Sequence, residues 1–304
     1  MDRIDVMRLF VRIVERGSFS GAAVDLGLPR ATATTAIQRL ERDLGVHLLE
    51  RTTRRVRPTL DGALYQERCI QLLADLDEAE TIFRNTEPRG PLRVDLQGTL
   101  ARFFVLPALP DFIARYPDIT LNLSEGDRMV DLVAEGVDCV LRAGDLPDSG
   151  LVGRKVANFE QVTLASPAYL ARHGEPSTPD DLEGHLMVAY TASATGKPYP
   201  LEFGDGPLLR EVSLPYKIVV RGAETYTAAG RAGLGLIQIP RYRVIREIAA
   251  DAFVPVLAAS PPPPMPVYVL YPQNRHLSSR LRVFVDWIAE VFRVAAADSP
   301  GPDD

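Results

Sequence analysis

Three runs of apolar residues with helical spacing occupy the first 44 residues of the chain, and glycines separate them. Residues 4–16, 19–26 and 30–44 each place apolar side chains three or four positions apart, which makes one face of a helix apolar. Gly17 and Gly27 follow the first two runs, where glycine ends a helix at low steric cost. A helix, a short glycine turn and a second helix form a helix-turn-helix. The pattern therefore predicts a small helical domain at the N-terminus.

The third predicted helix has a polar face of small and basic side chains. In a helix-turn-helix, the N-terminal part of this helix enters the major groove of DNA. Threonine contacts base edges through its hydroxyl and thymine through its methyl group, and arginine reaches guanine or phosphate. The alternative is a solvated polar face on a small helical bundle. The predicted DNA-contacting residues of this helix are Arg30, Ala31, Thr32, Thr34, Thr35, Gln38 and Arg39.

An arginine-rich segment follows the three helices. Four arginines lie within the seven positions 51–57, and no acidic residue follows Glu50 there. Leu48, Leu49 and Val56 supply apolar anchors, so the segment is predicted to form a short strand pair, or wing. Arginines on a wing lie against phosphates or in the narrow groove. The predicted DNA contacts of the wing are Arg51, Thr53, Arg54 and Arg55.

The charge of the chain is unevenly distributed. Residues 1–60 hold 11 arginines and 7 acidic residues, a net charge of +4, whereas the whole chain has a formal net charge of −6. The remaining 244 residues therefore carry a net charge of −10. A basic end on an acidic body favours a polyanionic partner, such as double-stranded DNA, at one end only.

The N-terminal segment contains GSFSGAAVDLG followed by LPRATATTAIQRLERDLGVHLLERTTRRVRPTLDG. The spacing of its GSF, AA, I-x-R-L-E, LGV-x-L-L-x-R and T-x-x-G elements resembles the winged helix-turn-helix of LysR-type transcriptional regulators. This resemblance implies sequence-specific binding to operator or promoter DNA. The family usually has serine, glutamine, serine and arginine where this chain has Pro29, Arg30, Thr34 and Thr35. The departures bear on the operator sequence rather than on the binding mode.

A long linker helix is predicted to follow Thr59, which is a helix-capping residue. Its apolar stripe recurs every three to four positions and consists of Leu72, Leu76, Ala79 and Phe83. The stripe suits pairing with a second chain, and the alternative is packing on its own domain. The resemblance favours a homodimer or homotetramer, which holds two recognition helices about 34 Å apart on DNA. The sequence PRGP at residues 88–91 is predicted to end the helix as a hinge.

From residue 92 onward, predicted strands and helices alternate, with helices predicted at 101–116 and 129–135, which indicates a mostly parallel sheet covered by helices. The strands predicted at 92–96 and 139–142 are followed by small and polar residues. In open α/β sheets, ligands bind beyond the carboxyl ends of strands. Each of these loops has a plain turn as its alternative interpretation.

Later segments, among them PALPDFIARYPDITLNL and AAGRAGLGLIQIP, look like the effector-binding domain of LysR-type regulators. With the N-terminal segment, the resemblance covers about residues 2–293. It implies a type 2 periplasmic-binding-protein fold, in which the chain crosses twice between two lobes and an effector lies between them. The effector-binding residues implied are Gln97, Gly98, Thr99, Leu100, Glu125, Arg142, Gly144, Ala223, Glu224 and Thr225.

The expected fold class is therefore α/β, with a winged helix-turn-helix, a long linker helix and a two-lobed periplasmic-binding-protein-like effector domain. The expected domains are residues 1–59 for DNA binding, 60–87 for the linker and dimerisation helix, and 88–304 for effector binding. The expected lobes of the last domain are about 91–161 with 268–293 for lobe I, and about 162–267 for lobe II.

Catalytic motifs are missing from the sequence, which has no G-x-S-x-G elbow, P-loop or H-E-x-x-H motif. Its 4 histidines lack the spacing of a metal site. We therefore expect no catalytic residue, no metal and no cofactor. The expected partners are DNA, a small-molecule effector such as an organic acid or an aromatic compound, and RNA polymerase. The alternative is an enzyme or a solute-binding protein with a basic N-terminal extension.

The sequence also bears on location. It has no run of about 18 apolar residues that would suit a membrane span, and charges are mixed through its N-terminal segment. Its two cysteines, Cys69 and Cys139, form no C-x-x-C pair and suit a reducing compartment as small packed side chains. We therefore expect a cytoplasmic protein without a membrane partner.

Overall fold

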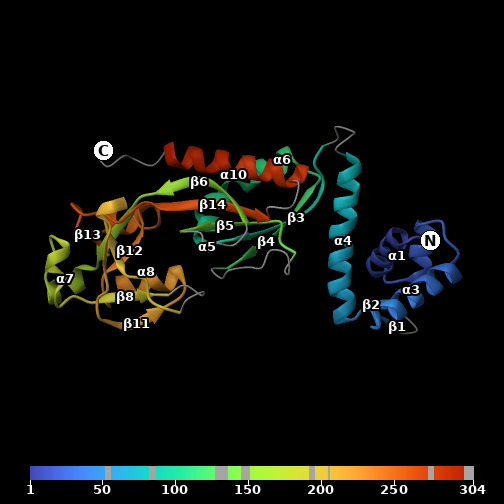
Figure 1. The fold of residues 1–304 in the computed structure, drawn as a ribbon, viewed down its shortest axis with the longest axis horizontal. Helices are drawn as coiled ribbons and strands as arrows, with labels where there is room; N and C mark the ends of the chain where they lie inside the picture. The colour runs from blue at the N-terminus through green and yellow to red at the C-terminus, as the bar shows by residue number, and fades with distance from the viewer. Residues whose placement is uncertain are drawn as a thin grey trace. The chain divides into compact units, whose positions relative to one another are not determined.

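The computed structural model describes residues 1–51, 56–81, 87–126, 136–144, 151–191, 196–204, 206–272 and 277–297. The chain forms two compact units, whose elements are labelled in Figure 1. The first unit contains Met1–Pro91 together with Asp118–Thr120 and Ser278–Arg280, and the second contains the rest of the chain.

The first unit is a winged helix-turn-helix followed by a long helix. Its elements are α1 (Arg3–Arg16), α2 (Phe19–Asp25), α3 (Arg30–Leu44), β1 (Leu49–Arg51), β2 (Val56–Pro58) and α4 (Leu60–Thr81). Phe10 and Ile13 of α1 are fully buried in one core with Ala33 and Ile37 of α3. Strands β1 and β2 pair antiparallel, with Glu50 opposite Arg57. The three predicted helices and the predicted strand pair are therefore confirmed.

Local sequence signals fix the ends of the helices in this unit. The Asp2 carboxylate accepts a hydrogen bond from the Asp5 amide at 2.7 Å, and the Asp5 carboxylate accepts one from the Asp2 amide at 3.2 Å, so a capping box starts α1. Gly17 and Gly45 end α1 and α3 in the left-handed conformation, at φ 59° and 72°. Pro29 precedes α3 as its N-cap and provides no side-chain hydrogen bond.

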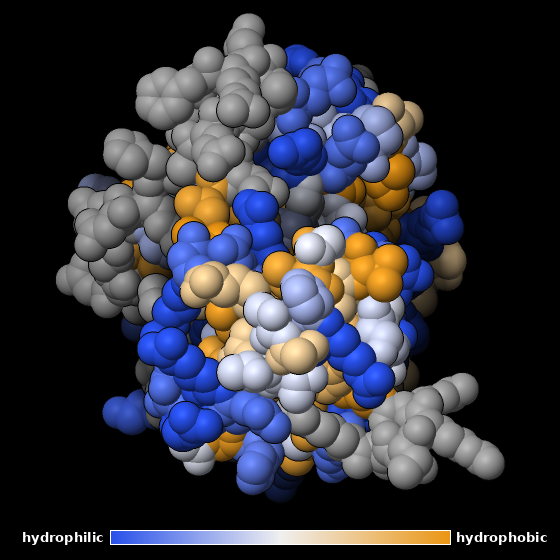
Figure 2. All heavy atoms as spheres, turned by 90° about the vertical axis from the view of Figure 1, so that its right-hand side faces the viewer, coloured by the Kyte–Doolittle hydropathy of each residue, from blue (hydrophilic) through white to orange (hydrophobic). Residues whose placement is uncertain are grey.

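Apolar side chains also reach the surface of the first unit. Figure 2 shows hydrophobic groups among hydrophilic ones on the face turned toward the viewer. On α2 and just after it, Val24 is 80% exposed and Leu26 is 39% exposed. Along α4, Leu60, Leu64 and Leu72 are exposed as well. A single exposed apolar residue needs no explanation, whereas a row of them along a helix indicates a contact surface.

A five-stranded sheet forms one lobe of the second unit, in the order β4-β3-β5-β14-β6. The strands are β3 (Gly90–Leu96), β4 (Ile119–Glu125), β5 (Cys139–Ala143), β6 (Leu151–Phe159) and β14 (Met265–Pro272). Strand β3 runs parallel to β5, whereas β14 runs antiparallel to both β5 and β6. Figure 1 shows α6 (Leu106–Arg115) and α10 (Ser279–Ala297) on the same side of this sheet.

The second lobe contains smaller sheets, in the orders β12-β7-β13, β11-β8 and β10-β9. Its strands are β7 (Gln161–Ala165), β8 (Met187–Tyr190), β9 (Leu201–Phe203), β10 (Arg210–Val212), β11 (Tyr216–Val220), β12 (Ile237–Pro240) and β13 (Val254–Val256). Its helices are α7 (Pro167–His173), α8 (Ala223–Arg231), α9 (Ile245–Ala249) and the short 3₁₀ turns Pro179–Leu182, Gly206–Leu208 and Arg241–Arg243. Buried apolar residues of β7, β8, β12 and α8 form its core.

The chain passes between the two lobes twice. It crosses from β6, which ends at Phe159, to β7, which begins at Gln161. It returns from β13, which ends at Val256, to β14, which begins at Met265. This two-lobed α/β fold is the one that the family resemblance implies.

Some elements differ from the sequence-based expectation. The helix predicted at 101–116 begins earlier, as α5 (Gly98–Leu100), and continues through a π-helical turn, η1 (Ala101–Val105), into α6. The helix predicted at 129–135 lies outside the described residues. Strand β6 was not predicted, because its exposed residues include Gly153, Arg154 and Lys155 and give no apolar alternation.

Candidate DNA-binding and effector sites

Helix α3 presents the candidate base-reading surface. Its residues Ala33, Ile37 and Leu40 are buried in the domain core, which fixes the opposite face toward solvent. The exposed side chains are Arg30, Ala31, Thr32, Thr35, Gln38 and Arg39. Six of the seven residues of α3 that were predicted to contact DNA are thus exposed.

Thr34 is the exception, because it is only partly exposed and its hydroxyl has a partner within the helix. Its Oγ1 donates a hydrogen bond to the Arg30 carbonyl oxygen at 3.0 Å. A threonine that bonds backward to the preceding turn keeps acceptor capacity but has used its proton. Thr32 and Thr35 are therefore better placed than Thr34 to donate a hydrogen bond to a base.

The wing is held against the recognition helix by a carboxylate. Glu41 of α3 accepts hydrogen bonds through Oε1 from the Leu48 amide at 2.9 Å and the Leu49 amide at 3.1 Å. The Val56 amide donates to the Gly17 carbonyl oxygen at 3.1 Å and ties the second wing strand to the end of α1. Arg57 is exposed on that strand. Thr53, Arg54, Arg55 and the side chain of Arg51 lie outside the described residues.

A separate ion-pair cluster joins α1 to α2. The Asp25 carboxylate accepts hydrogen bonds from Arg16 Nε and Arg12 Nε, both at 2.6 Å. The hydrogen bond from Arg16 is the main reason that the pKa of Asp25 lies below its usual value. This cluster fixes the first two helices, against which α3 packs.

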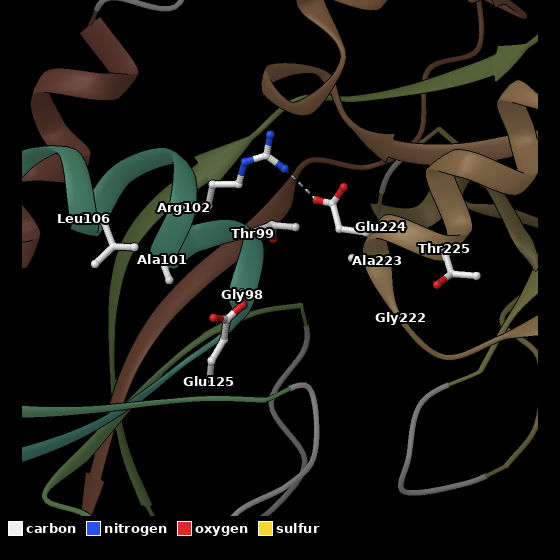
Figure 3. A pocket seen from close by; sticks show the side chains of 10 residues that line it. All are labelled: Gly98, Thr99, Ala101, Arg102, Leu106, Glu125, Gly222, Ala223, Glu224 and Thr225. Carbon is white, nitrogen blue, oxygen red and sulfur yellow. Dashed lines mark ion pairs between the residues drawn. The ribbon is translucent and has the colours of Figure 1, made fainter.

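The second candidate site is a cleft between the lobes of the second unit, with a volume of about 340 Å³ (Figure 3). One wall comes from the start of the helical run α5–η1–α6 and from the end of β4. The other wall is the turn into α8. The lining residues are Gly98, Thr99, Ala101, Arg102, Leu106, Glu125, Gly222, Ala223, Glu224 and Thr225.

An ion pair spans the two walls of this cleft. Arg102 Nη1 lies 3.5 Å from Glu224 Oε1, and both side chains are about two-thirds exposed. Figure 3 shows the two side chains reaching toward each other from η1 and from the start of α8. An exposed pair of this kind contributes at most about 1 kcal/mol, so a ligand can displace it at little cost.

Behind the cleft lies a cluster of aromatic side chains. Thr99 is buried and its side chain is hydrogen-bonded with that of Tyr242. Burial raises the pKa of Tyr242, and the bond with Thr99 opposes this shift. The Tyr242 ring packs on Phe104 and Phe159, with ring centroids 4.8 Å and 4.7 Å apart. Thr99 therefore links the cleft to the packing at the first crossover between the lobes.

Six of the ten predicted effector residues line the cleft, and four do not. The lining ones are Gly98, Thr99, Glu125, Ala223, Glu224 and Thr225. Leu100 is fully buried, and the Gln97 side chain accepts a hydrogen bond from the Ala143 amide at 2.8 Å. Gly144 lies in the turn after β5, and its amide donates to the Pro266 carbonyl oxygen.

Arg142 also does not line the cleft. Its guanidinium forms an ion pair with the Asp95 carboxylate on the neighbouring strand, and the two side chains are only 12% and 9% exposed. Arg142 Nη1 donates further hydrogen bonds to the carbonyl oxygens of Asp95 and Leu141. Ser124 donates to the other Asp95 oxygen at 2.5 Å. Arg142 therefore cross-links strands β3 and β5.

Sequence reasoning did not single out Ala101, Arg102 and Leu106. A signal for two of them was present, since Arg102 and Leu106 follow Thr99 at three and seven positions and share its helix face. Among the described residues, no group of three or more His, Cys, Asp or Glu side chains could hold a metal ion. No helix in the described part of the chain is long and apolar enough to span a membrane.

Two family models match the chain. The model of the bacterial regulatory helix-turn-helix protein of the lysR family matches residues 4–63, and that of the LysR substrate binding domain matches residues 85–293. The chain belongs to the LysR family of transcriptional regulators. It is thus a LysR-type regulator with a helix-turn-helix DNA-binding domain and an effector-binding domain, and this family consists of regulators rather than enzymes.

Relatives of this LysR-type regulator match it over nearly its whole length. The HTH-type transcriptional regulator YhjC of Escherichia coli K12 is 39% identical over 295 residues, which are 96% of this chain and 99% of YhjC. An HTH-type transcriptional repressor of Pseudomonas aeruginosa is 38% identical over 294 residues, which are 96% of this chain and 93% of the relative. The structure of the LysR-type regulator CrgA from Neisseria meningitidis is similar with a TM-score of 0.56 at 31% identity, over 95% of this chain and 99% of CrgA.

Proposed function

We propose that this LysR-type regulator reads operator DNA with the exposed face of α3 and grips the flanking phosphates with the wing. The exposed row of Arg30, Thr32, Thr35, Gln38 and Arg39 on one helix of a winged helix-turn-helix carries the proposal. No side chain caps α3, so the first amides of this helix are available to a phosphate oxygen. Arg57 and the predicted contacts Arg51, Thr53, Arg54 and Arg55 supply the wing.

Variants of α3 and of the wing are expected to act differently on DNA binding. Thr35→Ala combined with Gln38→Ala should reduce the preference for DNA from the region upstream of the gene over scrambled DNA by ~1–3 kcal/mol. Arg57→Ala should weaken binding to both DNAs alike, because phosphate contacts carry no sequence information. Fluorescence anisotropy with the two duplexes measures both effects. An α3 variant that keeps its full preference would contradict the role of this face.

The inter-lobe cleft is the proposed effector site. It is concave, it combines apolar and polar lining, and its walls come from both lobes, so a ligand bound there contacts both. A ligand shifts the relative position of the lobes only if it binds one arrangement better than another. The residues proposed to contact the effector directly are those of the predicted set that line the cleft. Gln97, Leu100, Arg142 and Gly144 are proposed to support this site from behind.

The proposed assembly is a homodimer, or a tetramer built from dimers, that forms through α4. Leu72 on this helix is 53% exposed, and Leu76 is partly exposed four residues later. The side chain of Ala79 and all of Phe83, which complete the predicted stripe, lie outside the described residues. An apolar row along a helix suits pairing with an identical helix.

We further propose that the protein acts in the cytoplasm and contacts RNA polymerase, as its role as a DNA-binding regulator favours.

A further inference from the structure

Among the residues that the structure describes, those that line the inter-lobe cleft carry more negative than positive charge. Among the described lining residues, the carboxylates are Glu125 and Glu224, and the only guanidinium is that of Arg102. Figure 3 shows Glu125 below the start of α5 and Glu224 at the start of α8, on opposite walls. These described lining residues therefore carry one more negative than positive charge, and the two negative charges come from different lobes.

Glu125 occupies the position at the start of the helical run α5–η1–α6. Its side chain is so close to the Gly98 backbone that a methyl group on Gly98 would overlap Glu125 Oε1. The first amides of a helix carry a partial positive charge that attracts anions. Since the chain's own carboxylate already lies there, an anionic ligand would have to displace it or accept its repulsion.

Glu224, on the opposite wall, also places a negative charge at the start of a helix and repels an anionic ligand. It is the acidic residue in the first turn of α8, where a negative charge complements the helix end. Its partner Arg102 is two-thirds exposed, and their atoms are 3.5 Å apart. A cation brought into the cleft can therefore replace Arg102 as the partner of Glu224.

Two further guanidinium groups of the described second unit, those of Arg142 and Arg243, already have partners. Arg142 is paired with Asp95, away from the cleft lining. Arg243 donates through Nη2 to the Ala223 carbonyl oxygen and to Thr227 Oγ1, both at 2.8 Å. Neither is placed among the cleft's described lining residues. Among the described lining residues, an organic acid, one of the two classes expected from the sequence, would meet only Arg102 as a cationic partner.

We propose that the effector of this protein is a small organic cation, such as a primary amine or an amidine, held between Glu125 and Glu224. Ala101 and Leu106 line the same cleft and offer apolar contact to its hydrocarbon part. Because the two carboxylates belong to different lobes, one cation in contact with both favours the closed arrangement over an open one. This inference rests on the proposed function of the cleft as the effector site.

The test compares amines with acids of the same shape. Benzylamine and butylamine, each against benzoate and butanoate, are titrated into the full-length protein at constant ionic strength by calorimetry and thermal shift. We expect the amines to bind more tightly than the matched acids. Glu125→Gln and Glu224→Gln should each weaken amine binding about fivefold, and Arg102→Gln should strengthen it by a similar factor, because it frees Glu224. Glu175→Gln, an exposed position outside the cleft lining, should change nothing.

Two kinds of result overturn the proposal, and they differ in what else they contradict. Tighter binding of the acids, lost in Arg102→Gln, would reject a cationic effector while leaving the cleft as the effector site. Failure of all four compounds to bind at millimolar concentration, or binding that the cleft variants do not alter, would reject the cationic effector and count against the cleft itself. The inverse response of the glutamate and arginine variants is the result that the proposal requires.

Discussion

Gly62→Ala is expected to destabilise the DNA-binding unit by ~3 kcal/mol, although alanine is the better helix former. Gly62 lies in the first turn of α4, where its backbone touches the chain that enters the wing. A methyl group there would overlap the Leu48 carbonyl oxygen and come within 2.9 Å of its carbon atom. These are backbone atoms, so no side-chain rotation relieves the overlap. The Leu48 oxygen also accepts a hydrogen bond from the Thr59 amide at 3.0 Å. This hydrogen bond would be strained if the added methyl group pushed α4 away from Leu48.

Gly21→Ala in α2 is the matched control. Added at Gly21, a methyl group would lie 3.7 Å from its nearest neighbours, which is ordinary contact, and the backbone there is helical. This substitution should therefore increase the free energy of unfolding by ~0.4–1 kcal/mol. Trp287, the single tryptophan, lies in the other unit, so hydrogen exchange over residues 1–81 is the suitable measurement. Equal effects of the two substitutions would contradict the close approach of α4 to the wing.

Arg142→Met is expected to lower the free energy of unfolding of the effector-binding domain by ~3–5 kcal/mol. The variant leaves the Asp95 carboxylate, whose side chain is only 9% exposed, without its cationic partner. At roughly 2–4 °C per kcal/mol, the melting temperature should fall by about 6–20 °C. The double variant Asp95→Asn with Arg142→Met removes both charges and should recover most of the loss.

Arg154→Met serves as the control for Arg142→Met. Arg154 pairs with Asp286 at 2.6 Å, but the two side chains are 44% and 62% exposed, so solvent screens the pair. Its loss should cost less than about 1 kcal/mol. Thermal unfolding of the four proteins checks the prediction. If Arg142→Met has the melting temperature of the wild type and loses only the response to ligand, then Arg142 binds the effector and does not cross-link the sheet.

The helices of the first unit were predictable because their signals are local. The third run of apolar residues predicts residues 30–44, and α3 spans Arg30–Leu44. Gly17 ends α1 as its position suggests. Capping and apolar spacing act within a few residues, so the sequence displays them directly. The departure at Ala101–Val105 is different, because an inserted π-helical residue leaves no clear mark in a pattern of period 3.6.

The cleft was predictable only in part, for physical reasons. Thr99 could be named because it follows a strand, where ligands bind to an open α/β sheet, and Glu224 because the family resemblance implies it. Arg142 occupies such a position too, yet its partner Asp95 lies 47 residues earlier on another strand. Arg102 was overlooked because its significance depends on Glu224, which comes from the opposite lobe. Side chains that meet across strands or lobes leave no spacing in the sequence from which to infer the contact.

The salt dependence of DNA binding tests most directly whether this protein grips DNA through its basic N-terminal unit. The equilibrium constant for a duplex from its own upstream region is measured by anisotropy over a range of potassium chloride concentrations. Contact with about six phosphates predicts a slope near −5 when log K is plotted against log salt, and Arg57→Ala should make the slope shallower by about one. Binding that does not change with salt, or no retention of the duplex even at low salt, would contradict the proposal.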